Sequence, residues 1–190
     1  QKLSIVSRMI QTHEQRGTDR DLFFVGLGGW DHHRLVKENL QIKFSALNAA
    51  LATFAQELKI QERFEDVTTV VASEFARTIT PNSGGGTDHA WGGHYMMFGG
   101  SVKGGQVYGT YPDNITPEGS LNIGRGRILP TTSWDCVWNS VCQWMGVDQE
   151  EELDMCLPNR ANVVGVDGYT DLFSEGDLFQ SPTRRLRRHG

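Results

Sequence analysis

The sequence predicts an α/β fold, and three features of the chain carry that prediction. Residues 22–27 form a continuous apolar run, and residues 67–72 form a second run that is rich in β-branched side chains. Such runs are typical of strands buried on both faces in a parallel sheet. Between them, residues 40–58 place apolar side chains at intervals of four and three, the pattern of an amphipathic helix. Strand, long helix and strand make a βαβ unit with a right-handed crossover.

The remaining expected elements are shorter. Residues 3–13 place apolar side chains with helical spacing, which predicts a first short helix. Residues 95–98 predict a short strand inside a glycine-rich region. A further helix is expected over residues 134–145, because Thr132 or Ser133 can cap its first turn and a glycine follows its last. Its tryptophans are interpreted as packing residues.

No repeat or low-complexity linker divides the chain. We therefore expect one domain or part of one. Its α/β portion covers residues 1–160, and beyond it the pattern weakens into a loop-rich extension over residues 161–190. The extension ends in a basic tail, which is interpreted as a solvated terminus or as a contact for an acidic partner. The tail comprises Arg184, Arg185, Arg187 and Arg188.

Composition excludes several classes of protein. The chain has 190 residues with 18 basic and 23 acidic side chains, a formal charge of −5, so nothing global indicates nucleic-acid binding. No apolar stretch approaches the ~18 residues of a membrane span. The three cysteines, Cys136, Cys142 and Cys156, lack the spacing of a metal finger and are expected to be small core residues. The first residues lack the pattern of a signal peptide.

Acidic, imidazole and guanidinium side chains follow both predicted strands and recur in the glycine-rich region. Ligands of open α/β sheets bind beyond the carboxyl ends of the strands. Carboxylate and imidazole together suit zinc, manganese or iron. From spacing alone, a metal site and ordinary polar turns both remain open interpretations. The candidate residues are Asp31, His33, Glu74, Arg77, Asp88, His89 and His94.

Five separated motifs stand out along the chain. They are FVGLGGWDHH at 24–33, SEFART at 73–78, GTDHAWG at 86–92, FGGSVKGG at 98–105 and RILPTTS at 127–133. Together and in this order they resemble the domain-of-unknown-function 1501 family, which is placed in the alkaline-phosphatase/sulfatase superfamily. The resemblance covers residues 1 to about 160.

The resemblance implies an alkaline-phosphatase-like fold, a mostly parallel sheet flanked by helices. Members of the family are normally about twice as long, so the chain is expected to be the carboxyl-terminal half of that domain, able to associate with an amino-terminal half or to form a homo-oligomer. The resemblance also implies export to the periplasm or the extracellular space. Two positions depart from the family pattern, where His32 replaces a threonine and Ala76 replaces a glycine.

The superfamily implies a two-metal site for phosphate or sulfate esters. Carried over, one divalent metal would be held by Asp31, His33 and His89. The second metal usually takes an Asp-His pair, but that position reads Glu74-Phe75 here, so either Asp88 substitutes or the second site is altered.

Two further side chains complete the expected site. Arg77 could bind an anionic oxygen, a role that suits the fork of a guanidinium group. His94 would be a further ligand or a proton donor, and a loop histidine facing water is an equal alternative.

Two functions are therefore expected. The first is a metal-dependent hydrolase of phosphate or sulfate esters that acts on a small anionic substrate with zinc, manganese or iron. The second is a non-catalytic structural or binding protein on the same scaffold, which the missing histidine beside Glu74 favours.

Overall fold

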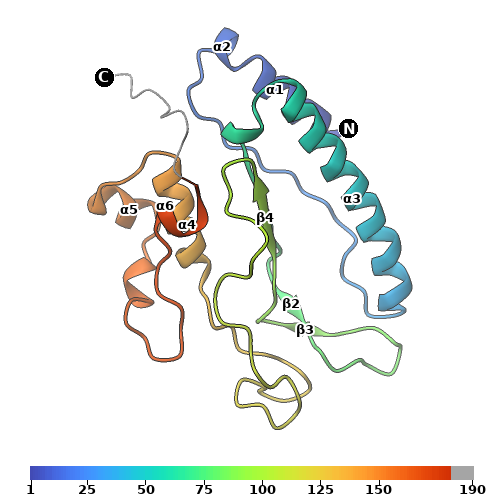
Figure 1. The fold of residues 1–190 in the computed structure, drawn as a ribbon. Coiled ribbons are helices and arrows are strands. Elements are labelled where there is room, and N and C mark those ends of the chain that lie inside the picture. The colour runs from blue at the N-terminus through green and yellow to red at the C-terminus, as the bar shows by residue number, and fades with distance from the viewer. Residues whose placement is uncertain (181–190) are drawn as a thin grey trace. The chain divides into compact units, whose positions relative to one another are not determined.

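The computed structural model describes residues 1–180, so the predicted basic tail lies outside the described residues. Helices and short strands alternate with long loops along the chain (Figure 1). The α-helices are α1 (Lys2–Gln11), α2 (His13–Arg16), α3 (Val36–Ile60), α4 (Trp134–Trp144), α5 (Glu150–Cys156) and α6 (Glu175–Leu178). The strands are β1 (Thr68–Val71), β2 (Ala76–Arg77), β3 (His89–Ala90) and β4 (Met96–Gly99), and 3-10 turns lie at Phe64–Asp66 and Arg160–Asn162.

The chain divides into two compact units. The first unit takes Gln1–Val67, Val71–Met96 and Pro112–Pro130, and the second takes Thr68–Val70, Met97–Tyr111 and the chain from Thr131 onward. Each unit has its own apolar cluster. All the sequence-predicted site residues lie in the first unit, which is therefore the one that positions the candidate site.

The first unit packs α1 against α3, and Figure 1 shows the two helices side by side. Ile10 of α1 and Phe54 and Leu58 of α3 are buried together, with Phe23 and other half-buried apolar side chains around them. Both helices were predicted from apolar spacing, and both predictions are confirmed. Gly17 ends the short helix α2 with φ at +65°, a left-handed conformation that glycine adopts at little cost.

The predicted strand over residues 22–27 is wrong. This segment is irregular, and the side chains of Leu22 and Phe24 are 89% and 95% exposed. Only alternate side chains turn inward, since Phe23 packs on the α1–α3 cluster and Val25 is half-buried. The physical reason is that a strand needs a hydrogen-bonding neighbour, and within residues 1–180 no strand pairs with this segment. The βαβ unit predicted from it is therefore not formed.

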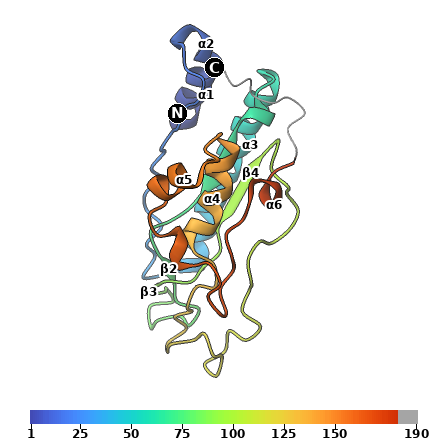
Figure 2. The ribbon, with the colours of Figure 1, turned by 90° about the vertical axis from the view of Figure 1, so that its left-hand side faces the viewer.

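The second unit is built on α4, which contacts α5 and α6 (Figure 2). Ser133 caps α4 by accepting a hydrogen bond from the backbone N–H of Asp135, as predicted. Leu178 and Phe179 are fully buried against α4 side chains, and Trp144 stacks on Phe179 with the ring centroids 5.1 Å apart. Trp144 is thus a packing residue, as expected.

The cysteines of this unit differ from one another. Cys136 is buried, Cys142 is half-buried and Cys156 is exposed, so the expectation that all three are core residues is wrong for Cys156. Cys156 is the last residue of α5, a helix of seven residues in which only Leu153 is buried.

The fold is mixed α/β, with two small two-stranded sheets in the described part of the chain. The predicted strands at 67–72 and 95–98 are confirmed as β1 and β4, which pair with each other. β2 and β3 pair antiparallel, with Arg77 opposite His89. Among residues 1–180, no helix is both long enough and apolar enough to cross a membrane.

Candidate metal centre

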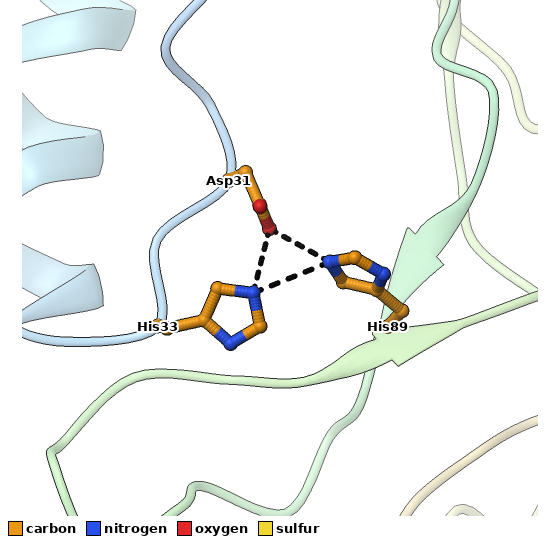
Figure 3. A group of neighbouring side chains, drawn as sticks. All are labelled: Asp31, His33 and His89. Carbon is orange, nitrogen blue, oxygen red and sulfur yellow. Dashed lines mark hydrogen bonds and ion pairs between the residues drawn. The ribbon is translucent and has the colours of Figure 1, made fainter.

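Three side chains from two segments of the first unit converge on one point. Nε2 of His33 and Nε2 of His89 lie 3.2 Å apart, and they lie 3.1 Å and 3.0 Å from the Oδ1 atom of Asp31. Figure 3 shows the three polar ends pointing toward one another. The side chains are each about half exposed, at 54% for Asp31, 50% for His33 and 53% for His89. The cluster is thus open to solvent and to ions.

The loop before α3 supplies Asp31 and His33, and strand β3 supplies His89. The glycine-rich loop holds the first segment in place, because the backbone N–H of Thr87 donates to the carbonyl of His32 at 3.2 Å. Gly86 lies so close that a Cβ atom there would collide with the backbone of His33. A glycine at this position therefore permits the approach that brings the cluster together.

Arg77 holds the carboxylate of Asp31. Its guanidinium group donates to Asp31 Oδ1, to the carbonyl of Thr87 and, through Nε, to Thr87 Oγ1 at 2.7 Å. The hydrogen bond from Arg77, aided by His89 and the nearby His33, holds the pKa of Asp31 below its usual value. Asp31 is therefore ionised and fixed in orientation at neutral pH, which suits a metal ligand.

Asp88 lies behind His33. One of its carboxylate oxygens is 3.5 Å from Nδ1 of His33 and 3.1 Å from Nδ2 of Asn82, and the other accepts from Arg125 at 2.6 Å. The hydrogen bond from Asn82, with the charge of Arg125 and the contact with His33, lowers the pKa of Asp88. An ionised carboxylate at Nδ1 favours the tautomer of His33 that leaves an Nε2 lone pair facing the cluster.

The seven candidate residues differ in their position relative to the convergent group. Asp31, His33 and His89 form the convergent group, and Arg77 and Asp88 contact its members. Glu74 lies outside the group and accepts a hydrogen bond from Ser73. His94 is exposed in the loop between β3 and β4, also outside the group. The metal-binding and catalytic roles of all seven stay predictions.

Three residues that organise the cluster were not predicted. Asn82 accepts hydrogen bonds from the backbone of Gly84 and Gly86, and its Nδ2 donates to the carbonyl of His33. The sequence signal was an asparagine before a triple glycine, which is common turn chemistry. Thr87 belongs to the GTDHAWG motif, and Arg125 stands in a Gly-Arg-Gly turn with φ at +58°.

The donor set fits a single divalent cation. A carboxylate oxygen and two imidazole nitrogens are the ligands of catalytic zinc, and tetrahedral zinc with ligands at 2.0–2.1 Å sets them about 3.3 Å apart. The observed separations of 3.0 to 3.2 Å come close to that spacing. A cation at the centre can accept a lone pair from all three atoms at once, whereas a hydrogen bond joins them only in pairs.

Comparison with known proteins gives one match. The model of a family described as "Protein of unknown function (DUF1501)" matches residues 2–123. No curated protein matches the chain. No solved structure matches it either. The family match includes Asp31, His33, Arg77 and His89, and it spans well over half of the 190 residues. The chain therefore belongs to the DUF1501 family.

Proposed function

We propose that the chain provides the metal centre of a hydrolase that cleaves phosphate or sulfate esters. The observation that carries the proposal is the convergence of Asp31 Oδ1, His33 Nε2 and His89 Nε2 within 3.2 Å of one another. Three protein ligands around an open position are typical of catalytic metal sites, whereas structural zinc sites close with four.

The metal in this proposal is a single divalent ion. Zinc fits the two imidazoles best, and manganese or iron would accept the same ligands. When bound, the ion supplies positive charge that polarises the ester and stabilises the leaving or attacking oxygen. Glu74 and Asp88 lie outside the group, so the proposal does not include a second ion held by described residues.

The neighbouring residues have positioning roles in this proposal. Arg77 orients Asp31 and keeps it ionised, and its ion pair with Asp31 occupies the fork that an anionic substrate would otherwise take. Asp88 orients His33 through Nδ1. Such outer contacts fix ring orientation and raise the affinity of the site for its ion.

We also propose that the chain belongs to the alkaline-phosphatase/sulfatase superfamily, which its sequence motifs resemble. An alkaline-phosphatase-like sheet requires more paired strands than residues 1–180 contain. The unpaired apolar segment at residues 22–27 would find its neighbours in further polypeptide. Export from the cytoplasm belongs to the same proposal, and cell fractionation with an antibody against the native protein tests it.

Metal analysis tests the proposal directly. The purified chain is freed of metal with a chelator and titrated with Zn²⁺, Mn²⁺ and Fe²⁺, with calorimetry and elemental analysis as readouts. We expect one Zn²⁺ per chain, and we expect His89→Ala to weaken its affinity by 100-fold or more, because two ligands cannot replace three. Hydrolysis of phenyl phosphate and phenyl sulfate is then measured with the loaded protein.

His13→Ala is the matched control. His13 lies in α2 with Nδ1 3.0 Å from the carbonyl of Ile10, away from the cluster. Its loss should leave the metal stoichiometry and affinity unchanged. Equal zinc affinity in the wild type and in His89→Ala would overturn the proposed site. One bound ion with no hydrolysis of either ester would leave the site standing and overturn the activity.

A non-catalytic binding role is the second candidate. The observation that favours it is the exposure of Leu22 and Phe24, at 89% and 95%, in an extended segment with alternate side chains turned outward. Exposed apolar surface of this kind is typical of an interface. Sedimentation of the wild type and of a Leu22→Ser, Phe24→Ser double variant tests it. A monomer at every concentration argues against self-assembly.

A further inference from the structure

An apolar cavity opens beside His89 in the first unit. It has a volume of about 370 Å³ and is lined by Phe75, His89, Ala90, Trp91, Ile123 and Arg127. The ring of Phe75 stacks on the ring of His89, with centroids 4.3 Å apart. The cavity therefore begins at one of the three convergent side chains, and a molecule that lies in it also lies against the cluster.

The walls of the cavity are held by backbone hydrogen bonds. Residues 122–128 form a turn in which the N–H of Ile123 donates to the carbonyl of Arg127 at 2.9 Å. The N–H of Gly92 donates to the carbonyl of Ile128 at 2.8 Å, which ties this turn to the segment after β3. A Cβ atom at Gly92 would lie 2.6 Å from that same carbonyl oxygen. The turn at residues 122–128 and the segment after β3 are therefore in direct backbone contact at Gly92 and Ile128.

The lining favours a planar, apolar group. Trp91 and Ile123 are 65% and 45% exposed, although large apolar side chains gain about 1.5–3 kcal/mol by burial. Phe75 and Trp91 offer aromatic faces, which stack on other rings in offset or edge arrangements, and Ile123 adds aliphatic surface. A sugar would find few partners for its hydroxyl groups here, because Arg127 and His89 are the polar side chains among the lining residues.

Arg127 adds one positive charge to this apolar lining. Its side chain is half-buried, and within residues 1–180 no hydrogen bond or ion pair engages its guanidinium group. Two arginines that contact the cluster are paired, Arg77 with Asp31 and Arg125 with Asp88. A partly desolvated guanidinium group without a partner gains strongly from pairing with an anion.

The cavity beside His33 has a different, polar lining. His33 lines a second cavity together with Arg34, Asn82, Asp88 and Arg125, and polar side chains dominate it. An apolar group of a bound molecule therefore has a preferred side, toward His89 and away from His33.

We propose that the cavity beside His89 binds the organic part of the ester, and that this part is an aromatic ring carrying a second anionic group, such as a carboxylate, that pairs with Arg127. The inference rests on the proposed ester hydrolysis for its placement of the scissile group at the cluster. It adds the substrate class, an aryl ester with an acidic substituent.

The test measures binding of the ring itself, without metal and without turnover. The full chain is kept in chelator, and 4-hydroxybenzoate, phenol and cyclohexanecarboxylate are titrated with tryptophan fluorescence and calorimetry as readouts. We expect 4-hydroxybenzoate to bind at least tenfold more tightly than either of the others. It alone has both an aromatic ring and a carboxylate, because phenol lacks the carboxylate and cyclohexanecarboxylate lacks the aromatic ring.

Variants separate the two recognition elements. Arg127→Gln should weaken 4-hydroxybenzoate about tenfold and leave phenol unchanged, while Trp91→Ala should weaken both. Arg34→Gln, which removes a charge from the other cavity, should change neither. Arg127→Lys keeps a cation and should retain part of the preference. If wild-type protein binds phenol and 4-hydroxybenzoate equally, the inference is overturned without reference to any variant.

Asp31→Asn separates this inference from the proposed function. The variant should lose zinc affinity and keep its binding of 4-hydroxybenzoate, since Asp31 does not line the cavity. Zinc binding by the wild type without any preference for the acidic ring would overturn the inference and leave the metal site intact.

Discussion

The carboxylate of Asp88 lies 3.5 Å from Nδ1 of His33, on the ring edge opposite the Nε2 atom that faces Asp31 and His89. The sequence suggested Asp88 as a possible ligand of a second metal ion. In the structure Asp88 instead contacts His33, a proposed ligand of the first ion. A carboxylate behind a metal-binding imidazole fixes both its tautomer and its orientation.

Replacement of Asp88 should therefore weaken metal binding without removing a ligand. We expect Asp88→Ala to lower zinc affinity by about 10- to 100-fold, with the stoichiometry still one per chain. Competition with a chromophoric chelator measures the change. Asp113→Asn, an exposed acidic residue of the same unit, is the control. A loss of stoichiometry rather than affinity would instead make Asp88 a direct ligand.

Gly86 should be irreplaceable for geometric reasons. A Cβ atom there would collide with the backbone of His33, and backbone atoms cannot move aside as a flexible side chain can. We expect Gly86→Ala to cost about 1–3 kcal/mol in unfolding free energy and to weaken zinc binding by displacing His33. Thermal denaturation and zinc titration measure the two effects.

The control for Gly86 is Gly104→Ala, because a Cβ atom at Gly104 meets nothing within 4 Å. This variant should unfold within about 1 °C of the wild type. Equal stability of Gly86→Ala and Gly104→Ala would show that the loop relaxes freely, and the account of how the cluster is assembled would then be wrong.

Helices α1, α3 and α4 were predictable because their signals are local, whereas the short helices α5 and α6 were not predicted. The apolar stripe of α3 and the Ser133 cap of α4 need only neighbours within a few residues. The segment at 22–27 failed for the opposite reason. An apolar run predicts burial only where other strands lie beside it, and within residues 1–180 Phe24 is 95% exposed.

The candidate site was also only partly predictable from the sequence. Asp31 and His33 are close in sequence, but their convergence with His89 depends on contacts across more than 50 residues. Composition and spacing alone did not decide between a metal site and ordinary polar turns. The resemblance to a family implied that Asp31, His33 and His89 bind one metal together. The supports from Asn82 and Thr87 are ordinary loop chemistry, so their sequence gave no signal that set them apart.

The three thiols should react in order of exposure. Burial raises the pKa of the Cys136 thiol, and burial together with the neighbouring Cys156 raises that of Cys142, so both hold less of the reactive thiolate. Cys156 is exposed at the end of α5. We expect iodoacetamide to label Cys156 first and Cys136 last, as read by peptide mass spectrometry over time. In denaturant the three rates should converge, and fastest labelling of Cys136 in the native protein would contradict the packing of α4.

Asp177 should make the anchoring of α6 depend on pH. Its carboxylate accepts from the backbone N–H and from the hydroxyl of Ser174, both at 2.7 Å, and Lys103 lies near enough to add attraction. These hydrogen bonds lower its pKa below the ordinary value of 3.8. Because the pKa of Asp177 is lower in the folded state than in the unfolded state, the ionised carboxylate stabilises the fold at pH values above the unfolded-state pKa. That stabilisation is lost as the pH falls through the folded-state pKa.

The variant Asp177→Asn keeps an acceptor and removes the charge. Because the side chain is exposed, the screened contribution is small, about 0.5 kcal/mol at neutral pH, which corresponds to about 1–2 °C in Tm. We expect that difference from the wild type between pH 5 and 8, and we expect it to shrink as the pH falls below 3.8, the ordinary value. The measurement is Tm against pH for the two proteins side by side. A difference that grows toward low pH has the wrong sign for a lowered pKa and would mean that Asp177 is not held by Ser174 in the native state.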